Sequence, residues 1–381
     1  MRRPRSTDDE KPIWIREYKR ACEQHADATR GRTHERSEVS EAESQPDVET
    51  GMDDMIDVHT HYVPNGWPDL RGHIGPDAPW LKIETESDAM IMMGTREFRR
   101  ISANAWSAEV RLADMDSDGV RTQVVSPTPA FFNYGRSPQQ AALVARIFND
   151  LALEIVAPAS DRLIPFCQVP LQDADEACRE LDRCLDNGHR GVEIGNHVGD
   201  RDLDSEGVIA FLQHCADQDV PIFVHPWDMH SSPRLNRWMA QWLTGMPAET
   251  HLSILALILG GVFDRIGDSL RIAFAHGGGS FAFWLGRVEN AWHERNDVVG
   301  TSKFPPSHYL GRFYVDSVVF DERALRLLVA TIGPEKIMLG SDYPYPLGER
   351  KVGEVIRKSS FLDSTTRAML TRSNAVRFLG L

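Results

Sequence analysis

From Met55 onward, short runs of β-branched and aromatic residues alternate with longer amphipathic stretches. Eight runs fit buried strands, and they read MIDVHTH, TQVVSP, LIPFCQVP, GVEIG, PIFVHP, RIAFAH, FYVDSV and IMLGSDYP. Strands that alternate with helices predict βαβ units and a parallel sheet. Eight such strands indicate a closed (β/α)8 TIM barrel, whose usual size is about 250 residues. An open doubly wound sheet is the alternative, but no glycine-rich dinucleotide loop follows the first strand.

Two kinds of segment depart from this alternation. Residues 1–54 are rich in Arg, Glu, Asp and Ser and poor in branched apolar residues, so we expect a mostly disordered N-terminal extension. Residues 55–381 are then the barrel domain. Within it, residues 62–106 form an insertion after the first strand, and residues 228–266 form a second long stretch after PIFVHP. Insertions that follow barrel strands lie on the catalytic face, so both can shape a pocket.

Composition excludes some partners. The 381 residues are 41% hydrophobic and carry a formal net charge of −14, which disfavours broad binding to nucleic acid or to anionic membranes. No uninterrupted apolar run reaches the roughly 20 residues of a membrane span, and no secretory signal is apparent. The five cysteines form no C-x-x-C pair. We therefore expect reduced thiols and a cytoplasmic protein.

Residues that can bind metal or move protons recur at strand ends. His59 and His61 close the first strand, where positions i and i+2 share a face. His225, His276 and Asp342 close three others, and a closed barrel gathers these ends around one axis. Any one of these histidines alone is more often an ordinary hydrogen-bonded residue, but coincidence is improbable for the set. Three imidazoles and a carboxylate suit zinc or a similar divalent ion.

His276 is assigned to proton transfer, because the three glycines after it allow close approach and a histidine can accept or donate a proton in the physiological pH range. A role as a fourth histidine ligand stays open. Three arginines, Arg99, Arg287 and Arg295, are candidates for binding a carboxylate, since a guanidinium offers a bidentate fork. Their spacing alone does not distinguish them from solvated surface charges.

Longer strings point to a known family. These are IDVHTHYVP, PLQDADEAC, GVEIGNHVGD, IFVHPWDM, WLTGMPAET, AFAHGGGSFAFWLGRVENAW and MLGSDYPYPLGE. With them the chain resembles the 2-amino-3-carboxymuconate-6-semialdehyde decarboxylases, a branch of the amidohydrolase superfamily in tryptophan and nitrobenzoate degradation. The resemblance runs from about residue 56 to the C-terminus, and VHPWDM and GMPAET favour this branch over general amidohydrolases.

The resemblance implies zinc-dependent, non-oxidative decarboxylation of the semialdehyde. It also implies roles for particular residues. The implied zinc ligands are His59, His61, His225 and Asp342, with His276 as the acid/base that activates the metal-bound water. Arg99 and Arg295 would hold the carboxylates of a small dicarboxylate substrate, and Trp242 would line the pocket. Arg287 would reach the neighbouring subunit's site in a homodimer.

The sequence departs from the family pattern at a few positions. Glu193 stands where glutamine is expected, and we expect it to bond to a backbone group, with a place in the metal shell as the alternative. His230 can alter the polarity of the pocket, and residues 1–54 have no counterpart in the pattern. Rival functions are a decarboxylase of an aromatic acid, a hydrolase on the same scaffold, and a barrel that only binds a metabolite or protein.

Overall fold

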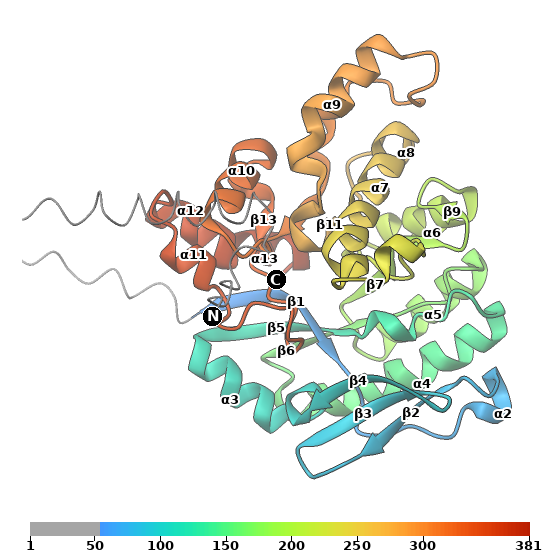
Figure 1. The fold of residues 1–381 in the computed structure, drawn as a ribbon. Coiled ribbons are helices and arrows are strands. Elements are labelled where there is room, and N and C mark those ends of the chain that lie inside the picture. The colour runs from blue at the N-terminus through green and yellow to red at the C-terminus, as the bar shows by residue number, and fades with distance from the viewer. Residues whose placement is uncertain (1–53) are drawn as a thin grey trace, which may run out of the picture. The chain divides into compact units, whose positions relative to one another are not determined.

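The computed structural model describes residues 54–381, and the predicted disorder of residues 1–54 lies almost wholly outside this range. Its centre is a sheet of eight parallel strands in the order β1-β5-β6-β7-β10-β11-β12-β13 (Figure 1). Their bounds are β1 Met55–Tyr62, β5 Val120–Pro127, β6 Leu163–Cys167, β7 Gly191–Gly195, β10 Ile222–His225, β11 Ile272–Phe274, β12 Tyr314–Asp316 and β13 Ile337–Met338. All eight predicted strands are present.

The sheet closes on itself between its first strand and the segment after its last. Val58 N–H donates to the carbonyl of Leu339 at 2.9 Å, and His61 N–H donates to that of Tyr343 at 2.7 Å. The N–H of Asp342 donates to His59 O at 2.9 Å. This is the (β/α)8 TIM barrel that the alternation predicts, and its C-terminal strand ends form one rim.

Helices follow the strands and surround the barrel (Figure 1). Their bounds are α3 Ala108–Asp118, α4 Pro138–Val156, α5 Ala174–Asp186, α6 Glu206–Asp217, α7 Met246–Leu259, α8 Val262–Ile266, α9 Phe281–Glu294, α10 Glu322–Ile332, α11 Glu354–Lys358, α12 Ser364–Ala368 and α13 Asn374–Leu379. Local sequence sets several of their starts. The side chains of Ser107, Ser137 and Asp173 each accept a hydrogen bond from a backbone N–H in the first turn of α3, α4 and α5.

The insertion after β1 forms a small layer of its own. It contains α2 (Arg71–Ile74) and an antiparallel sheet of β2 (Pro79–Ile83), β3 (Asp88–Met93) and β4 (Arg96–Ser102). A further short hairpin, β8 (His197–Val198) with β9 (Arg201–Asp202), follows β7.

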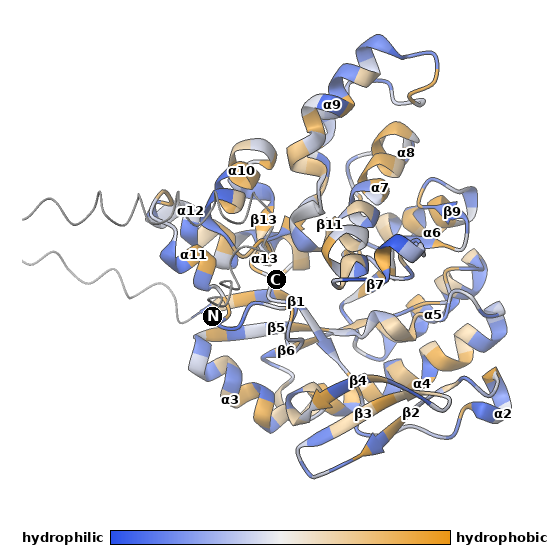
Figure 2. Cartoon of the chain, viewed as in Figure 1, coloured by the Kyte–Doolittle hydropathy of each residue, from blue (hydrophilic) through white to orange (hydrophobic). Residues whose placement is uncertain are grey.

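Apolar residues of strands and helices pack together inside the domain. Hydrophobic and hydrophilic residues alternate along the surrounding helices (Figure 2). One cluster fills the barrel itself and includes Ile56, Val58, Phe166 and Phe223. Phe378 of α13 belongs to the same cluster, so the last helix covers one end of the barrel. Apolar packing inside the barrel thus supports the layer of polar residues above it.

The first strand is irregular where the polar layer begins. Its register against β5 shifts between Asp57 and Thr60, as at a β-bulge. Ile56 and Val58 belong to the apolar cluster inside the barrel, whereas the rings beyond the shift, His59 and His61, lie at the rim. Because of this irregularity, β1 contributes side chains both to the apolar core and to the site at the rim.

A fully buried cation fixes this strand from outside. Arg111 of α3 donates to Thr60 Oγ1 at 3.1 Å, to Gln123 Oε1 at 3.0 Å and to the carbonyl of His61 at 2.5 Å. Its guanidinium also lies 4.8 Å from the ring centroid of Tyr343. One guanidinium thus ties together β1, β5 and the segment after β13.

One helical stretch, Gln241–Leu259, is long and apolar enough to cross a membrane by those two measures alone. It joins a π-helix, Gln241–Gly245, to α7. A single stretch of this kind is weak evidence, because core helices of soluble proteins pass the same test. Ile254, Leu257 and Ile258 of α7 lie in the main core of the domain.

Candidate metal centre

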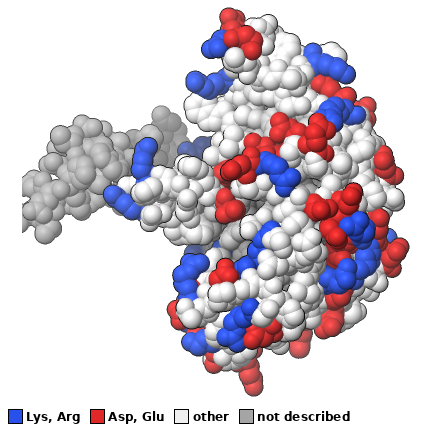
Figure 3. All heavy atoms as spheres, turned by 90° about the vertical axis from the view of Figure 1, so that its right-hand side faces the viewer, with Lys and Arg blue, Asp and Glu red and all other residues white. Residues whose placement is uncertain are grey.

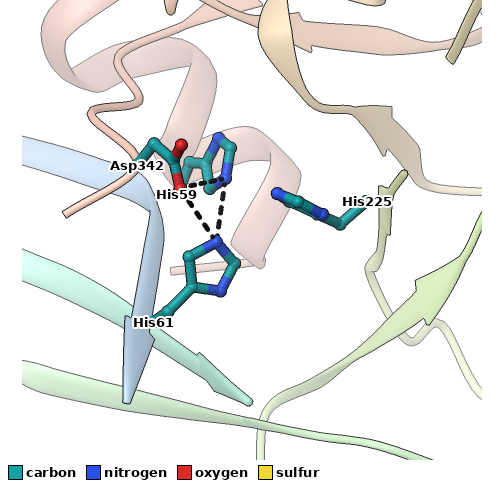
Figure 4. A group of neighbouring side chains, drawn as sticks. All are labelled: His59, His61, His225 and Asp342. Atoms are coloured by element: carbon teal, nitrogen blue, oxygen red, sulfur yellow. Dashed lines mark hydrogen bonds and ion pairs between the residues drawn. The ribbon is translucent and has the colours of Figure 1, made fainter. Parts of the chain in front are cut away.

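Four predicted ligands converge at the rim of the barrel, with His59 and His61 from β1, His225 from β10 and Asp342 from the turn after β13 (Figure 4). The Nε2 atoms of His59 and His61 lie 3.2 Å apart. Asp342 Oδ1 lies 3.2 Å from His61 Nε2 and 3.6 Å from His59 Nε2. One ligand atom from each of the four residues lies within 4.8 Å of the others.

The second nitrogen of each ring fixes its orientation. His59 Nδ1 is 2.5 Å from the carboxylate of Asp316, His61 Nδ1 is 3.1 Å from the carbonyl of Pro127, and His225 Nδ1 is 3.0 Å from that of Pro226. These acceptors hold the proton on Nδ1 and leave Nε2 free to bind a metal.

The protonation states also fit a metal ion. Burial lowers the pKa of His61 to about 4 and lowers that of His225 well below its usual range, so both rings are neutral near pH 7. Burial opposes charge on Asp342, but hydrogen bonds from His276 and His61 hold the pKa of its carboxyl well below the usual range. His225 Nε2 is buried and has no hydrogen-bond partner among residues 54–381. Such an unpaired group is costly unless something binds it, and these donors suit a divalent ion.

Asp316, at the end of β12, was not singled out from the sequence. Its Oδ2 accepts from the ring of His59 and, at 2.9 Å, from the backbone N–H of His276. Its Oδ1 accepts from the N–H groups of Gly277 at 2.8 Å and Val318 at 3.0 Å. The sequence did contain a signal for it, because Asp316 lies within the predicted strand FYVDSV, near the end where barrel strands carry their functional residues.

His276 lies beside the four ligands but outside their set. Its Nε2 is 3.7 Å from Asp342 Oδ2, the oxygen that faces away from His61, and its ring centroid is 5.0 Å from that of His225. Burial opposes its charge, but the carboxylates of Asp342 and Asp316 raise the pKa of His276 above its ordinary value. This geometry favours proton transfer over a role as a fourth histidine ligand.

Two residues of the site also have a strained backbone. His276 and Asp342 have φ values of 57° and 61°, in the left-handed region that side chains larger than glycine rarely adopt. The glycines after His276 allow its turn to pack closely. A Cβ on Gly277 would lie 2.6 Å from Val319 Cγ1, and one on Gly279 would lie 2.2 Å from the carbonyl oxygen of Pro247. A side chain at either position would collide with a neighbouring segment of the same chain, so both positions require glycine.

The expectation for Glu193 was wrong. Its carboxyl lies fully buried on β7, 3.8 Å from His61 Nδ1, but neither oxygen has a hydrogen-bond partner in the described part of the chain. It does not belong to the group of four ligands either. Burial and the nearby charge of Asp342 raise the pKa of Glu193 well above its usual range, which favours the neutral acid. His230 is exposed, and its backbone N–H donates to Glu249.

The arginines predicted to bind substrate lie in different places. Arg99 is half-buried on β4, with its guanidinium 4.5 Å from the ring centroid of Tyr345. Arg287 and Arg295 are exposed on or just after α9, and Arg295 pairs with Asp297 at 2.9 Å. Trp242 is half-buried in the π-helix Gln241–Gly245. The fold thus brings Arg99 toward the rim, whereas the other two arginines point into solvent.

A cavity of about 530 Å³ lies between the insertion sheet and the rim. It is lined by Arg96 and Phe98 of β4, by Tyr134, and by Trp227, which follows His225 closely in sequence. On the face of the molecule shown in Figure 3, acidic and basic side chains are interspersed. Because the net charge is −14, an anionic ligand would need local arginines such as Arg96 and Arg136 of this cavity to attract it.

Fold and site together define a metal-dependent (β/α)8-barrel enzyme. The chain belongs to the amidohydrolase family, whose model matches residues 56–381. Two relatives carry the name 2-amino-3-carboxymuconate-6-semialdehyde decarboxylase. The protein from Dictyostelium discoideum is 38% identical over 86% of this chain and 91% of its own. The one from Caenorhabditis elegans is 32% identical over 87% of this chain and 96% of its own. The chain is accordingly a metal-dependent decarboxylase, a carboxy-lyase.

Solved structures agree on the fold. The 5-carboxyvanillate decarboxylase of Sphingomonas paucimobilis superposes with a TM-score of 0.71 at 23% identity. The match covers 86% of this chain and 99% of that one. At this level of identity the likeness establishes the barrel architecture, and the metal centre rests on the geometry described above.

The role of Asp316 can be tested by an Asp316→Asn substitution. An amide cannot replace all the acceptor contacts of the carboxylate, because its NH₂ group faces a donor. We expect metal affinity to fall by about 10- to 100-fold, the usual effect of losing such an orienting partner. Affinity is measured by competition with a chromogenic chelator. Asp297→Asn, at an exposed carboxylate away from the site, is the control, and equal affinity in both variants would contradict the role.

Proposed function

We propose that the chain converts 2-amino-3-carboxymuconate 6-semialdehyde to 2-aminomuconate 6-semialdehyde and CO₂, in the degradation of tryptophan or nitroaromatic compounds. The observation that carries this proposal is the buried cluster of three histidines and an aspartate beside His276 and Arg99. The names of the two relatives with 38% and 32% identity support the choice of substrate.

The reaction breaks the bond between a substrate carbon and its carboxylate. CO₂ leaves, the electron pair enters the conjugated system, and a proton then replaces the carboxylate on carbon. A bound divalent ion would supply a Lewis acid that polarises a substrate oxygen or lowers the pKa of a water. His276 Nε2, which lies 3.7 Å from Asp342 Oδ2, holds and transfers the proton.

Arg99 binds and orients the acid. Its fork matches a carboxylate, and its place on β4 puts it on the insertion side of the rim. Holding the dianion in one orientation aligns the bond that breaks with the π-system that accepts its electrons. The metal in this proposal is zinc, because neutral imidazoles and one carboxylate are ligands that zinc favours.

The proposal predicts decarboxylation by the zinc-loaded protein and its loss in His276→Asn. Asparagine tolerates the left-handed backbone at this position, so the fold and metal binding should persist. We expect kcat to fall by about 10²- to 10⁴-fold, as for loss of an acid/base group. The semialdehyde is generated in place from 3-hydroxyanthranilate by its dioxygenase, and its absorbance and the released CO₂ are followed.

Zinc content per chain is measured on the same samples. A zinc-loaded wild-type protein that does not accelerate loss of the semialdehyde would refute the substrate. An active His276→Asn variant would refute the role of His276 and leave the substrate standing.

A homodimer is the second part of the proposal. The outer face of α9 exposes Phe283 and Trp284, with 69% and 45% of their surfaces accessible, and it carries Arg287. Arg287 makes no ion pair with any residue of 54–381, so its charge is available to another molecule. We assign Arg287 to the metal centre of the neighbouring subunit, where a substrate carboxylate would bind it.

Mixing two inactive variants tests this assignment. Arg287→Ala keeps His276, and His276→Asn keeps Arg287, so a mixed dimer contains one complete site. Random pairing of equal amounts should restore about a quarter of wild-type activity, as expected for a two-fold assembly. Light scattering reports the dimer separately. Activity no higher than the sum of the two separate variants would contradict a shared site.

An aromatic acid is the alternative substrate, favoured by the sequence match to the gamma-resorcylate decarboxylase of Rhizobium radiobacter, which is 26% identical over 72% of this chain. The same assay with hydroxybenzoates distinguishes the two. For the location of the protein we propose the cytoplasm, because the four cysteines among residues 54–381 are all unpaired.

A further inference from the structure

Three side chains from distant parts of the chain lie next to one another at one side of the rim. The ring of Tyr345 lies 5.5 Å from the imidazole of His61, with an angle of 35° between their planes. The guanidinium carbon of Arg99 lies 4.5 Å from the centroid of the same phenol ring. Tyr345 therefore lies between a metal ligand on β1 and the cation that the insertion sheet contributes.

Hydrogen bonds fix Tyr345 at both ends. Its backbone N–H donates to the carbonyl of Asp342 at 3.1 Å, within the turn that carries this metal ligand. Its hydroxyl lies 2.6 Å from Thr128 Oγ1, and Thr128 donates its own proton to the carbonyl of Tyr62 at 2.8 Å. The Tyr345 hydroxyl must consequently be the donor to Thr128. The ring is thus held against rotation and against displacement.

Arg99 is held without using its hydrogen bonds to carboxylates. No carboxylate among residues 54–381 lies within ion-pair distance of it, whereas its neighbour Arg100 pairs with Glu84. The guanidinium lies against the Tyr345 ring and also close to its hydroxyl, and the N–H groups that are not used there can bind an anion. The second ring near this cation is Phe98, at 5.4 Å.

We propose that Tyr345 is a positioning residue for the substrate, which holds the Arg99 fork beside the metal centre and so sets how tightly a carboxylate binds. The inference rests on the proposed role of Arg99 in substrate binding. It assigns to the aromatic face of Tyr345, rather than to its hydroxyl, the larger share of the effect. Tyr345 itself neither transfers a proton nor binds the metal.

Two substitutions separate the face from the hydroxyl. Tyr345→Leu removes the face, whereas Tyr345→Phe retains the face and loses the hydroxyl with its contacts to Thr128 and Arg99. We expect Tyr345→Leu to raise KM about tenfold with kcat changed by less than about twofold, the size of a partly buried cation–π contact. Tyr345→Phe should restore most of the binding. Zinc content should be the same in all variants.

The effect must also depend on Arg99. In an Arg99→Met background, Tyr345→Leu should add no further increase in KM, because the two residues act as one unit. A purely structural role would instead lower kcat or zinc content whether or not Arg99 is present. Independent increases in KM that multiply, or an unchanged KM in Tyr345→Leu, would overturn the proposal.

Binding of isophthalate to the zinc-loaded protein, measured by calorimetry, separates this inference from the choice of substrate. Loss of isophthalate affinity in Tyr345→Leu, only when Arg99 is present, supports the inference even if the semialdehyde is not turned over. Turnover of the semialdehyde together with equal isophthalate affinity in both proteins refutes the inference and leaves the proposed reaction standing.

Discussion

The carboxylate of Asp316 accepts hydrogen bonds from the ring of His59 and from the backbone N–H groups of His276, Gly277 and Val318. Although burial alone would favour the neutral acid, these contacts keep the pKa of this carboxyl below its ordinary value. One side chain thereby sets the tautomer of a candidate metal ligand and the position of His276, the histidine to which we assign proton transfer. Ligand geometry and proton transfer therefore depend on the same buried charge.

Another side chain at the rim also serves two partners. Asp342 offers one oxygen to the histidines of β1 and turns the other toward His276. Strained backbone at Asp342 and His276 is tolerated because the surrounding bonds and packing determine both turns. A rigid barrel supplies the metal ligands, and an inserted sheet supplies Arg99 from the side. Such a division lets substrate recognition vary while the metal centre is kept.

Much of this arrangement could be predicted from the sequence, because strand periodicity is local. The eight strands and the residues at their ends follow from it, and a parallel barrel then brings His59, His225 and Asp342 together. The roles of the arginines were inferred from the resemblance to the decarboxylase family and not from strand periodicity. Less predictable were the features set by contacts between distant segments, such as the unpaired carboxyl of Glu193 and the exposure of Arg295. The surroundings of Glu193 are formed by several strands, and the exposure of Arg295 depends on how α9 projects. Neither property can be inferred from the residues adjacent in sequence.

The central claim is that one metal ion is bound by His59, His61, His225 and Asp342. The most direct measurement is anomalous diffraction from crystals grown with zinc, recorded on both sides of the zinc absorption edge. A single strong peak among His59 Nε2, His61 Nε2, His225 Nε2 and Asp342 Oδ1, about 2.0–2.2 Å from each, is the predicted result. A peak at another place in the molecule, or none at the rim of the barrel, would contradict the account.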